Sequence, residues 1–236
     1  MGNIYINITG GDGTGKTSVQ EGLKNFLYEN NFFTFSEPGG TKHGEAIKRA
    51  ILTDSDRERR EELAFIYRSV IREARISIER ALRSLRDGDM KMFEVHAFAA
   101  ARAESNELIK KKLKEGKNIL GVRSYSCSKA YQGEARGVGF EKIKEAHKDI
   151  ELIMPDAEIF LELPYNIAKE RMEARKEMKS DRLDQEGEKF HRATIKGYEK
   201  YYEQVDFPIY RVNASQELQK VIADTKDIIN KIKTPN

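Results

Sequence analysis

The hydrophobic positions along the chain alternate between short continuous runs and helix-like spacings. Buried strands are predicted where β-branched and aromatic residues follow one another, at 3–9, 32–36, 118–122, 158–163 and 209–213. Apolar residues three or four positions apart predict helices at 18–30, 44–52, 91–115, 141–151, 165–179, 184–205 and 216–232. Strands that alternate with helices in this way predict an α/β fold, with a parallel five-stranded sheet and helices on both faces.

A further amphipathic pattern covers residues 57–87, and its unbroken helical periodicity predicts one long helix. Arginines in this segment are interleaved with aspartate and glutamate, which is typical of a solvated helix face and does not favour nucleic-acid binding. We expect residues 54–94 to form an extended helical insertion within a single domain that spans residues 1–236.

Composition narrows the class of protein. Hydrophobic residues make up 39% and charged residues 34% of the 236 positions, which excludes a disordered chain and does not fit a membrane protein. The net charge of +3 is too small to indicate a nucleic-acid partner. The first residues lack the basic segment of a signal peptide, and Cys127 is the single cysteine, so we expect a cytoplasmic protein without an internal disulfide.

The strongest motif, GGDGTGKT, lies between a predicted strand and a predicted helix and matches the P-loop pattern G-x-x-x-x-G-K-[ST]. Backbone N–H groups of such a loop point at phosphate oxygens, and the following helix adds the positive end of its dipole. We expect Lys16, as a solvent-facing charge, to reach the β- and γ-phosphates of ATP, and the Thr17 hydroxyl to hold Mg²⁺. The predicted ATP-binding residues are Gly10, Gly11, Asp12, Gly13, Thr14, Gly15, Lys16, Thr17 and Ser18. The motif predicts a P-loop NTPase fold, which many kinases, ATPases and GTPases share.

Other motifs resemble the thymidylate kinase family and lie in that family's order over nearly the whole chain. They are Glu37-Pro38-Gly39-Gly40-Thr41, Phe98 to Arg102, the turn Ala130-Tyr131-Gln132-Gly133, Pro155-Asp156, Asp181-Arg182 and Asn213 to Gln216. The resemblance implies transfer of the γ-phosphate of ATP, bound with Mg²⁺, to a deoxynucleoside monophosphate, dTMP before others. It also implies a homodimer.

The same resemblance implies a role for individual residues. Phe98 would stack on the thymine ring, Arg102 would hydrogen-bond the base edge, and Tyr131 and Gln132 would line the same pocket. The acceptor site would also include Glu37, Pro38 and Lys48, with Lys48 on the acceptor phosphate. Arg123 would bridge the acceptor and donor phosphates, and Asp12 would position the acceptor sugar or the metal. Arg171 and Arg175 would belong to a lid over ATP at about 165–182, and the implied catalytic residues are Lys16, Asp12, Arg123 and Arg175.

The chain departs from the family pattern in two places. Val122 stands where the family has an aspartate that supports the Mg²⁺–ATP assembly, so Asp12 and Glu37 become candidate substitutes. The segment 54–94 is longer than the family's connection, which implies a longer helical wall on the acceptor side or an altered dimer contact. Two alternatives stay open: a related kinase that acts on another nucleotide or deoxynucleoside, and a catalytically weakened nucleotide-binding protein.

Overall fold

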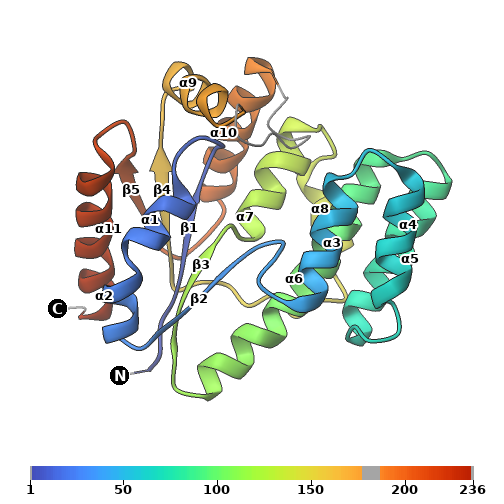
Figure 1. Ribbon diagram of the computed structural model, residues 1–236, viewed down its shortest axis with the longest axis horizontal. Helices are drawn as coiled ribbons and strands as arrows, with labels where there is room; N and C mark the ends of the chain where they lie inside the picture. The colour runs from blue at the N-terminus through green and yellow to red at the C-terminus, as the bar shows by residue number, and fades with distance from the viewer. Residues whose placement is uncertain (1, 177–186, 235–236) are drawn as a thin grey trace.

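The computed structural model describes residues 2–176 and 187–234, without the side chains of Arg175 and Lys176 (Figure 1). Its centre is a five-stranded sheet in the order β2-β3-β1-β4-β5, in which all four neighbouring pairs are parallel. The strands are β1 (Tyr5–Gly10), β2 (Phe32–Ser36), β3 (Asn118–Val122), β4 (Ala157–Glu162) and β5 (Ile209–Asn213). The predicted α/β fold and its parallel sheet are therefore confirmed.

Helices cover both faces of the sheet. One face packs against α1 (Lys16–Gly22), α2 (Lys24–Glu29) and α11 (Leu218–Lys233), whose Val19, Leu27 and Ile229 share a buried cluster with Ile8 and Ile159 of the strands. The other face packs against α6 (Met90–Lys114) and α10 (Glu188–Tyr202). The carboxyl ends of the parallel strands thus open between two helical layers, where α/β folds bind ligands.

A helical group lies at the side of the molecule opposite α11 (Figure 1). It consists of α3 (Lys42–Leu52), α4 (Asp56–Ile66), α5 (Arg72–Arg86) and α6, which share one buried apolar cluster. The prediction of a single helix over 57–87 is wrong, because the chain turns between α4 and α5. The Arg75 guanidinium donates to the carbonyl of Tyr67, and the Ile71 N–H donates to Glu104 Oε1 of α6 at 2.9 Å. These two side chains, one from α5 and one from α6, satisfy backbone groups of the turn.

Three smaller predictions also change. The helix predicted at 18–30 is divided into α1 and α2 at Leu23, and the helix predicted at 141–151 is α8 (Phe140–Ala146). The predicted turn at 130–133 lies inside a π-helix, η1 (Lys129–Ala135), which follows the short helix α7 (Tyr125–Ser128). Of the predicted lid at 165–182, α9 (Tyr165–Lys176) is described, whereas 177–182, with Asp181-Arg182, lies outside the described residues. Within the described part of the chain, no helix combines the length and apolar character needed to cross a membrane.

Candidate active site

The P-loop connects the end of β1 to the first residue of α1. Gly13 has φ +80°, and a Cβ at this position would stand 2.8 Å from the carbonyl oxygen of Ala168 on α9. Gly10 has φ +141°, and its Cβ would stand 2.6 Å from the carbonyl oxygen of Leu161. Both positions therefore require glycine, because each has a positive φ and because a Cβ at either position would collide with a neighbouring backbone carbonyl. The curled loop leaves the N-terminus of α1 facing the cleft above the sheet.

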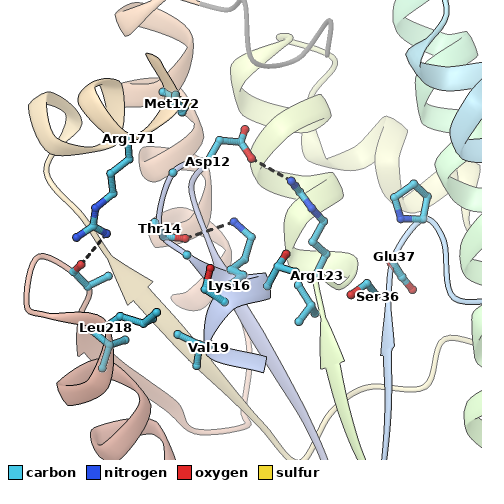
Figure 2. Close-up of a pocket in the computed structure, with 18 of the residues that line it drawn as sticks. Asp12, Thr14, Lys16, Val19, Ser36, Glu37, Arg123, Arg171, Met172 and Leu218 are labelled. Atoms are coloured by element: carbon cyan, nitrogen blue, oxygen red, sulfur yellow. Dashed lines mark hydrogen bonds and ion pairs between the residues drawn. The ribbon is translucent and has the colours of Figure 1, made fainter. Parts of the chain in front are cut away.

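A cleft of 740 Å³ lies at this edge of the sheet (Figure 2). It brings together most of the residues predicted for ATP and acceptor binding: Asp12, Gly13, Thr14, Gly15, Lys16, Thr17, Ser18, Glu37, Pro38, Lys48, Phe98, Arg123 and Arg171. Gly10 and Gly11 do not line the cleft, although their carbonyl groups accept hydrogen bonds from Lys16. Ala214 and Gln216 from the β5–α11 turn, and Leu218 at the start of α11, close the end of the cleft near Arg171.

Lys16 is buried, with 7% of its surface exposed, so the prediction of a solvent-facing lysine is wrong. Its ammonium group folds back over the loop and donates to the carbonyl oxygens of Gly10 at 3.0 Å and Gly11 at 2.7 Å. It also lies 3.4 Å from the Thr14 hydroxyl, a contact drawn in Figure 2. The charge is thus held beside the phosphate cradle by neutral oxygens, which a phosphate group can replace with stronger, charge-assisted bonds.

Asp12 and Arg123 form an ion pair across the cleft, with 2.9 Å between Oδ1 and Nη2 (Figure 2). Burial raises the pKa of Asp12, but the charges of Arg123 and Lys16 more than offset it, so this pKa lies below its ordinary value. The Arg123 guanidinium also stacks 5.6 Å from the centre of the Tyr131 ring. Arg123 therefore stays charged at the junction of β3 and α7, directly beside the P-loop.

A second, smaller cavity of 20 Å³ adjoins the cleft and holds about one water molecule. Its lining contains the four residues predicted for the base pocket, together with the two charged residues that line the cleft as well: Phe98, Arg102, Tyr131, Gln132, Glu37 and Arg123. The structure thus assembles the predicted base-binding residues from α6 and η1. This small cavity adjoins the cleft at Glu37, Phe98 and Arg123, which line both.

Arg102 is 4% exposed, and both of its terminal nitrogens are hydrogen-bonded within the protein. Nη2 pairs with Glu37 Oε2 at 2.5 Å and donates to the carbonyl oxygen of Ser124 at 2.8 Å. Nη1 donates to Ser128 Oγ at 2.9 Å and to His147 Nε2 at 3.0 Å. Only Nε has no partner among the described residues, so the guanidinium is fixed before any acceptor binds.

Sequence reasoning missed His147, Ser124 and Ser128 as partners of Arg102. The other ring nitrogen of His147, Nδ1, lies 2.8 Å from the carbonyl oxygen of Ile143, so Nδ1 carries the proton and Nε2 accepts from Arg102. Burial lowers the pKa of His147 to about 3, and the charge of Arg102 acts in the same direction. No local pattern marks these residues, because they come from separate turns and helices that meet only in the fold.

The residues present leave few protein ligands for a magnesium ion. Val122, at the end of β3, is 3% exposed, and the two candidate carboxylates are paired with arginines, Asp12 with Arg123 and Glu37 with Arg102. The described residues contain no group of three or more His, Cys, Asp or Glu suited to a metal. The exposed Thr17 lines the cleft. Because Mg²⁺ keeps several waters and binds nucleotide phosphates, the Thr17 hydroxyl would be its protein ligand in a shell otherwise filled by water and phosphate.

The remaining cations lie at the two ends of the cleft. Arg171 of α9 donates to the carbonyl oxygen of Ala214 at 2.9 Å, which joins the start of the predicted lid to the β5–α11 turn (Figure 2). Lys48 of α3 is half exposed, and its ammonium group lies 3.8 Å from Glu45 Oε2. Arg175 belongs to α9, but its side chain is outside the described part of the structure.

Comparisons with known proteins agree with this architecture. The family model described as thymidylate kinase matches residues 8–87 and 85–225. Thymidylate kinase from Leuconostoc mesenteroides is 32% identical over 234 residues, covering 97% of this chain and 96% of the relative, and that from Mesoplasma florum is 31% identical over 230 residues, covering 96% and 94%. The crystal structure of thymidylate kinase from Ehrlichia chaffeensis superposes with a TM-score of 0.63 at 17% identity, covering 98% of this chain and 100% of that chain, which supports the fold. The chain belongs to the thymidylate kinase family.

Proposed function

We propose that this protein transfers the γ-phosphate of ATP to thymidylate. The observation that carries the proposal is the sharing of Glu37, Phe98 and Arg123 between the large cleft and the small pocket. The donor site on the P-loop and the acceptor site on α6 therefore meet at the guanidinium of Arg123. Phosphoryl transfer depends chiefly on in-line placement of two substrates and on neutralisation of charge, and this arrangement supports both.

On the donor side, the P-loop N–H groups and Lys16 hold the β- and γ-phosphates. The Thr17 hydroxyl would hold Mg²⁺, which would supply neutralisation of the charge that develops on the phosphate oxygens. Arg123, held against Asp12, faces the point where donor and acceptor phosphates approach. Arg171 and, in this proposal, Arg175 supply further positive charge from α9.

On the acceptor side, the half-buried ring of Phe98 stacks on the base. The ring of the base enters as the small pocket widens. Arg102 presents a fixed guanidinium to the base edge, with Tyr131 and Gln132 beside it. Lys48 of α3 binds the acceptor phosphate at the open end, where its side chain is free to move. A base whose edge accepts a hydrogen bond from the Arg102 guanidinium is preferred, because a base without such an acceptor leaves buried polar groups unpaired.

Three parts of the proposal concern the protein as a whole. The helices of the segment 54–94 form the outer wall of the acceptor side, within one kinase domain. We expect a homodimer, which sedimentation velocity would test, and a cytoplasmic location, which cell fractionation would test. Nucleic acids and membranes are not expected as partners.

A coupled assay of ADP release tests the proposed activity. The panel contains dTMP, dUMP, dCMP, dGMP and thymidine, each with ATP and Mg²⁺. We expect dTMP to give the highest kcat/KM and thymidine to give no turnover. Phosphorylation of a nucleoside, or of another monophosphate in preference, would instead support the related kinase. ATP binding without ADP release on any acceptor would support the weakened nucleotide-binding protein.

A further inference from the structure

Glu158 of β4 is a buried acidic residue that the proposed function does not use. Its exposed fraction is 0%, and both of its carboxyl oxygens are hydrogen-bonded within the protein. Oε1 accepts from the Ser124 hydroxyl at 2.6 Å, and Oε2 accepts from the hydroxyls of Ser126 at 2.9 Å and Tyr202 at 3.0 Å. Because a buried carboxyl group destabilises a fold unless it is well paired, this constellation of three hydroxyls calls for an explanation.

Ser124 is the member of this network that leads to the site, because it is held at three of its atoms. Its hydroxyl is bound by Glu158, its carbonyl oxygen accepts from Arg102, and its N–H lies 3.4 Å from the sulfur of Cys127. Ser124 is 4% exposed, so these bonds form away from solvent. The residue is therefore a fixed point between the sheet, α6 and α7.

The residue directly before this fixed point is Arg123. It has φ 69°, a left-handed conformation that a residue with a side chain seldom adopts. Such a conformation persists only where neighbouring contacts impose it. On one side β3 supplies the ladder, since the Arg123 N–H donates to the carbonyl oxygen of Ile8 at 3.0 Å. On the other side the anchor is Ser124.

We propose that Glu158 is a positioning residue for phosphoryl transfer. Through the Ser124 hydroxyl it imposes the backbone turn that presents the Arg123 guanidinium to Asp12 and to the cleft. The inference rests on the proposed function, because it assigns Arg123 to the transfer step. Glu158 does not touch either substrate cavity, since it is absent from the linings of both, and its effect on the reaction is indirect.

A purely structural role for Glu158 makes a different prediction. The carboxyl group also ties β4 to α10 through Tyr202, whose hydroxyl lies 2.8 Å from the Thr9 hydroxyl of β1. If this were its whole contribution, each hydroxyl partner would matter only for stability. Ser124→Ala and Tyr202→Phe each remove one hydroxyl from Glu158, one on the Arg123 side and one on the α10 side. Ser124→Ala also removes the N-cap of α7, since this hydroxyl accepts from the Ser126 N–H at 3.2 Å, so Glu158→Leu, which keeps the cap, separates the two effects.

The experiment measures kcat and KM for ATP and dTMP, together with melting temperature, for these variants and for Glu158→Leu and Glu158→Gln. We expect Ser124→Ala and Glu158→Leu to lower kcat about tenfold or more, the scale of lost outer-sphere support, with KM for ATP little changed. Tyr202→Phe should lower the melting temperature and leave kcat near wild type. Glu158→Gln should restore most activity, because its amide oxygen still accepts from Ser124. In the Glu158→Leu background, adding Ser124→Ala should have no further effect on kcat.

A second readout does not depend on turnover. The second readout is the NMR resonance of the Arg123 side-chain Nε–H, which is identified by its absence in Arg123→Lys. Its chemical shift reports the surroundings of the guanidinium directly. We expect it to shift in Ser124→Ala and Glu158→Leu and to stay in place in Tyr202→Phe. An unchanged resonance with unchanged kcat in both Ser124→Ala and Glu158→Leu overturns the inference. A wild type inactive on dTMP overturns the proposed acceptor, while the resonance still decides whether Glu158 positions Arg123.

Discussion

The P-loop side and the acceptor side of the cleft hold their charged groups in opposite ways. On the P-loop side, Lys16 donates to backbone carbonyl oxygens of its own loop, at the edge of the cleft of 740 Å³. On the acceptor side, Arg102 is locked by a carboxylate, a carbonyl, a hydroxyl and an imidazole around a cavity of 20 Å³. Lys16 can therefore exchange its carbonyl partners for phosphate oxygens, whereas Arg102 is fixed before any acceptor binds.

This difference follows from how the two sides are built. The phosphate cradle is one contiguous loop, so its shape is set by its own glycines and by the strand and helix at its ends. On the acceptor side, Arg102 of α6 is held by Glu37 from the end of β2, by Ser124 and Ser128 from the ends of α7, and by His147 from the end of α8. We therefore expect substitutions on the P-loop side to change activity alone, and substitutions on the acceptor side to change activity and stability together.

The largest expected effect tests the acceptor side. Arg102→Ala leaves Glu37 buried without a cation, which destabilises by about 3–5 kcal/mol in comparable ion pairs. We expect a large fall in melting temperature and a raised KM for dTMP. The double variant Arg102→Ala with Glu37→Gln should regain much of the stability but not the affinity for dTMP. Equal affinity for dTMP in the double variant and the wild type would remove Arg102 from the base site.

Lys16→Ala tests the P-loop side. Removal of one preorganised charge from a transferring phosphate costs about 10²–10³ in kcat. The melting temperature should stay close to wild type, because the lysine donates to carbonyl oxygens and a hydroxyl of its own loop, and these groups remain in place. Lys24→Ala, at an exposed lysine on α2, is the matched control and should be fully active. Normal turnover by Lys16→Ala would refute the P-loop assignment.

Phe98→Ala tests whether the acceptor ring stacks at the junction of the two cavities. Base stacking on an aromatic ring is worth about 1–3 kcal/mol, which is about 5–150-fold in affinity. We expect KM for dTMP to rise by such a factor and KM for ATP to change little. Phe65→Ala, at a ring on α4 that is 77% exposed, should change neither. A loss of stability with unchanged KM values would make Phe98 a core residue.

The sequence predicts the P-loop side of the site better than the acceptor side, because the P-loop is contiguous in the chain and the residues of the acceptor side are not. All five strands lie within two residues of their predicted ends, because each is a dense apolar run followed by turn residues. The P-loop is recognisable because its residues are adjacent in the chain. The break between α4 and α5 contains neither glycine nor proline and depends on Arg75 and Glu104, so no local pattern reveals it. The partners of Arg102 are hidden in the same way.

Val122→Asp probes the metal site between the two sides. Asp12 and Glu37 are already paired with arginines, so the wild type relies on Thr17 and the phosphates, and we expect it to need a high Mg²⁺ concentration. An aspartate at the end of β3 should lower the Mg²⁺ concentration for half-maximal rate. It should also lower the melting temperature, because Val122 packs in the apolar cluster beneath the cleft. Val122→Asn, which has the same size without the charge, is the control, and an equal Mg²⁺ titration for all three proteins would contradict the prediction.

The effect that is smallest at neutral pH concerns the pH dependence of stability on the acceptor side. His147 stays neutral in the folded protein, since burial and then the charge of Arg102 lower its pKa to about 3, whereas an unfolded histidine titrates near 6.5. Between these values the unfolded chain binds more protons, so the free energy of unfolding falls as the pH drops, with a slope that approaches about 1.4 kcal/mol per pH unit for this one group.

His147→Gln retains an acceptor for Arg102 but does not titrate. Urea unfolding of both proteins from pH 7.5 to 4 should show a stability difference that is constant above pH 7 and moves in favour of the variant as the pH falls. Other titrating groups are common to both proteins and cancel in the difference. Parallel curves over the whole range would mean that His147 takes up a proton as readily in the folded protein as in the unfolded chain, and that Arg102 has another acceptor.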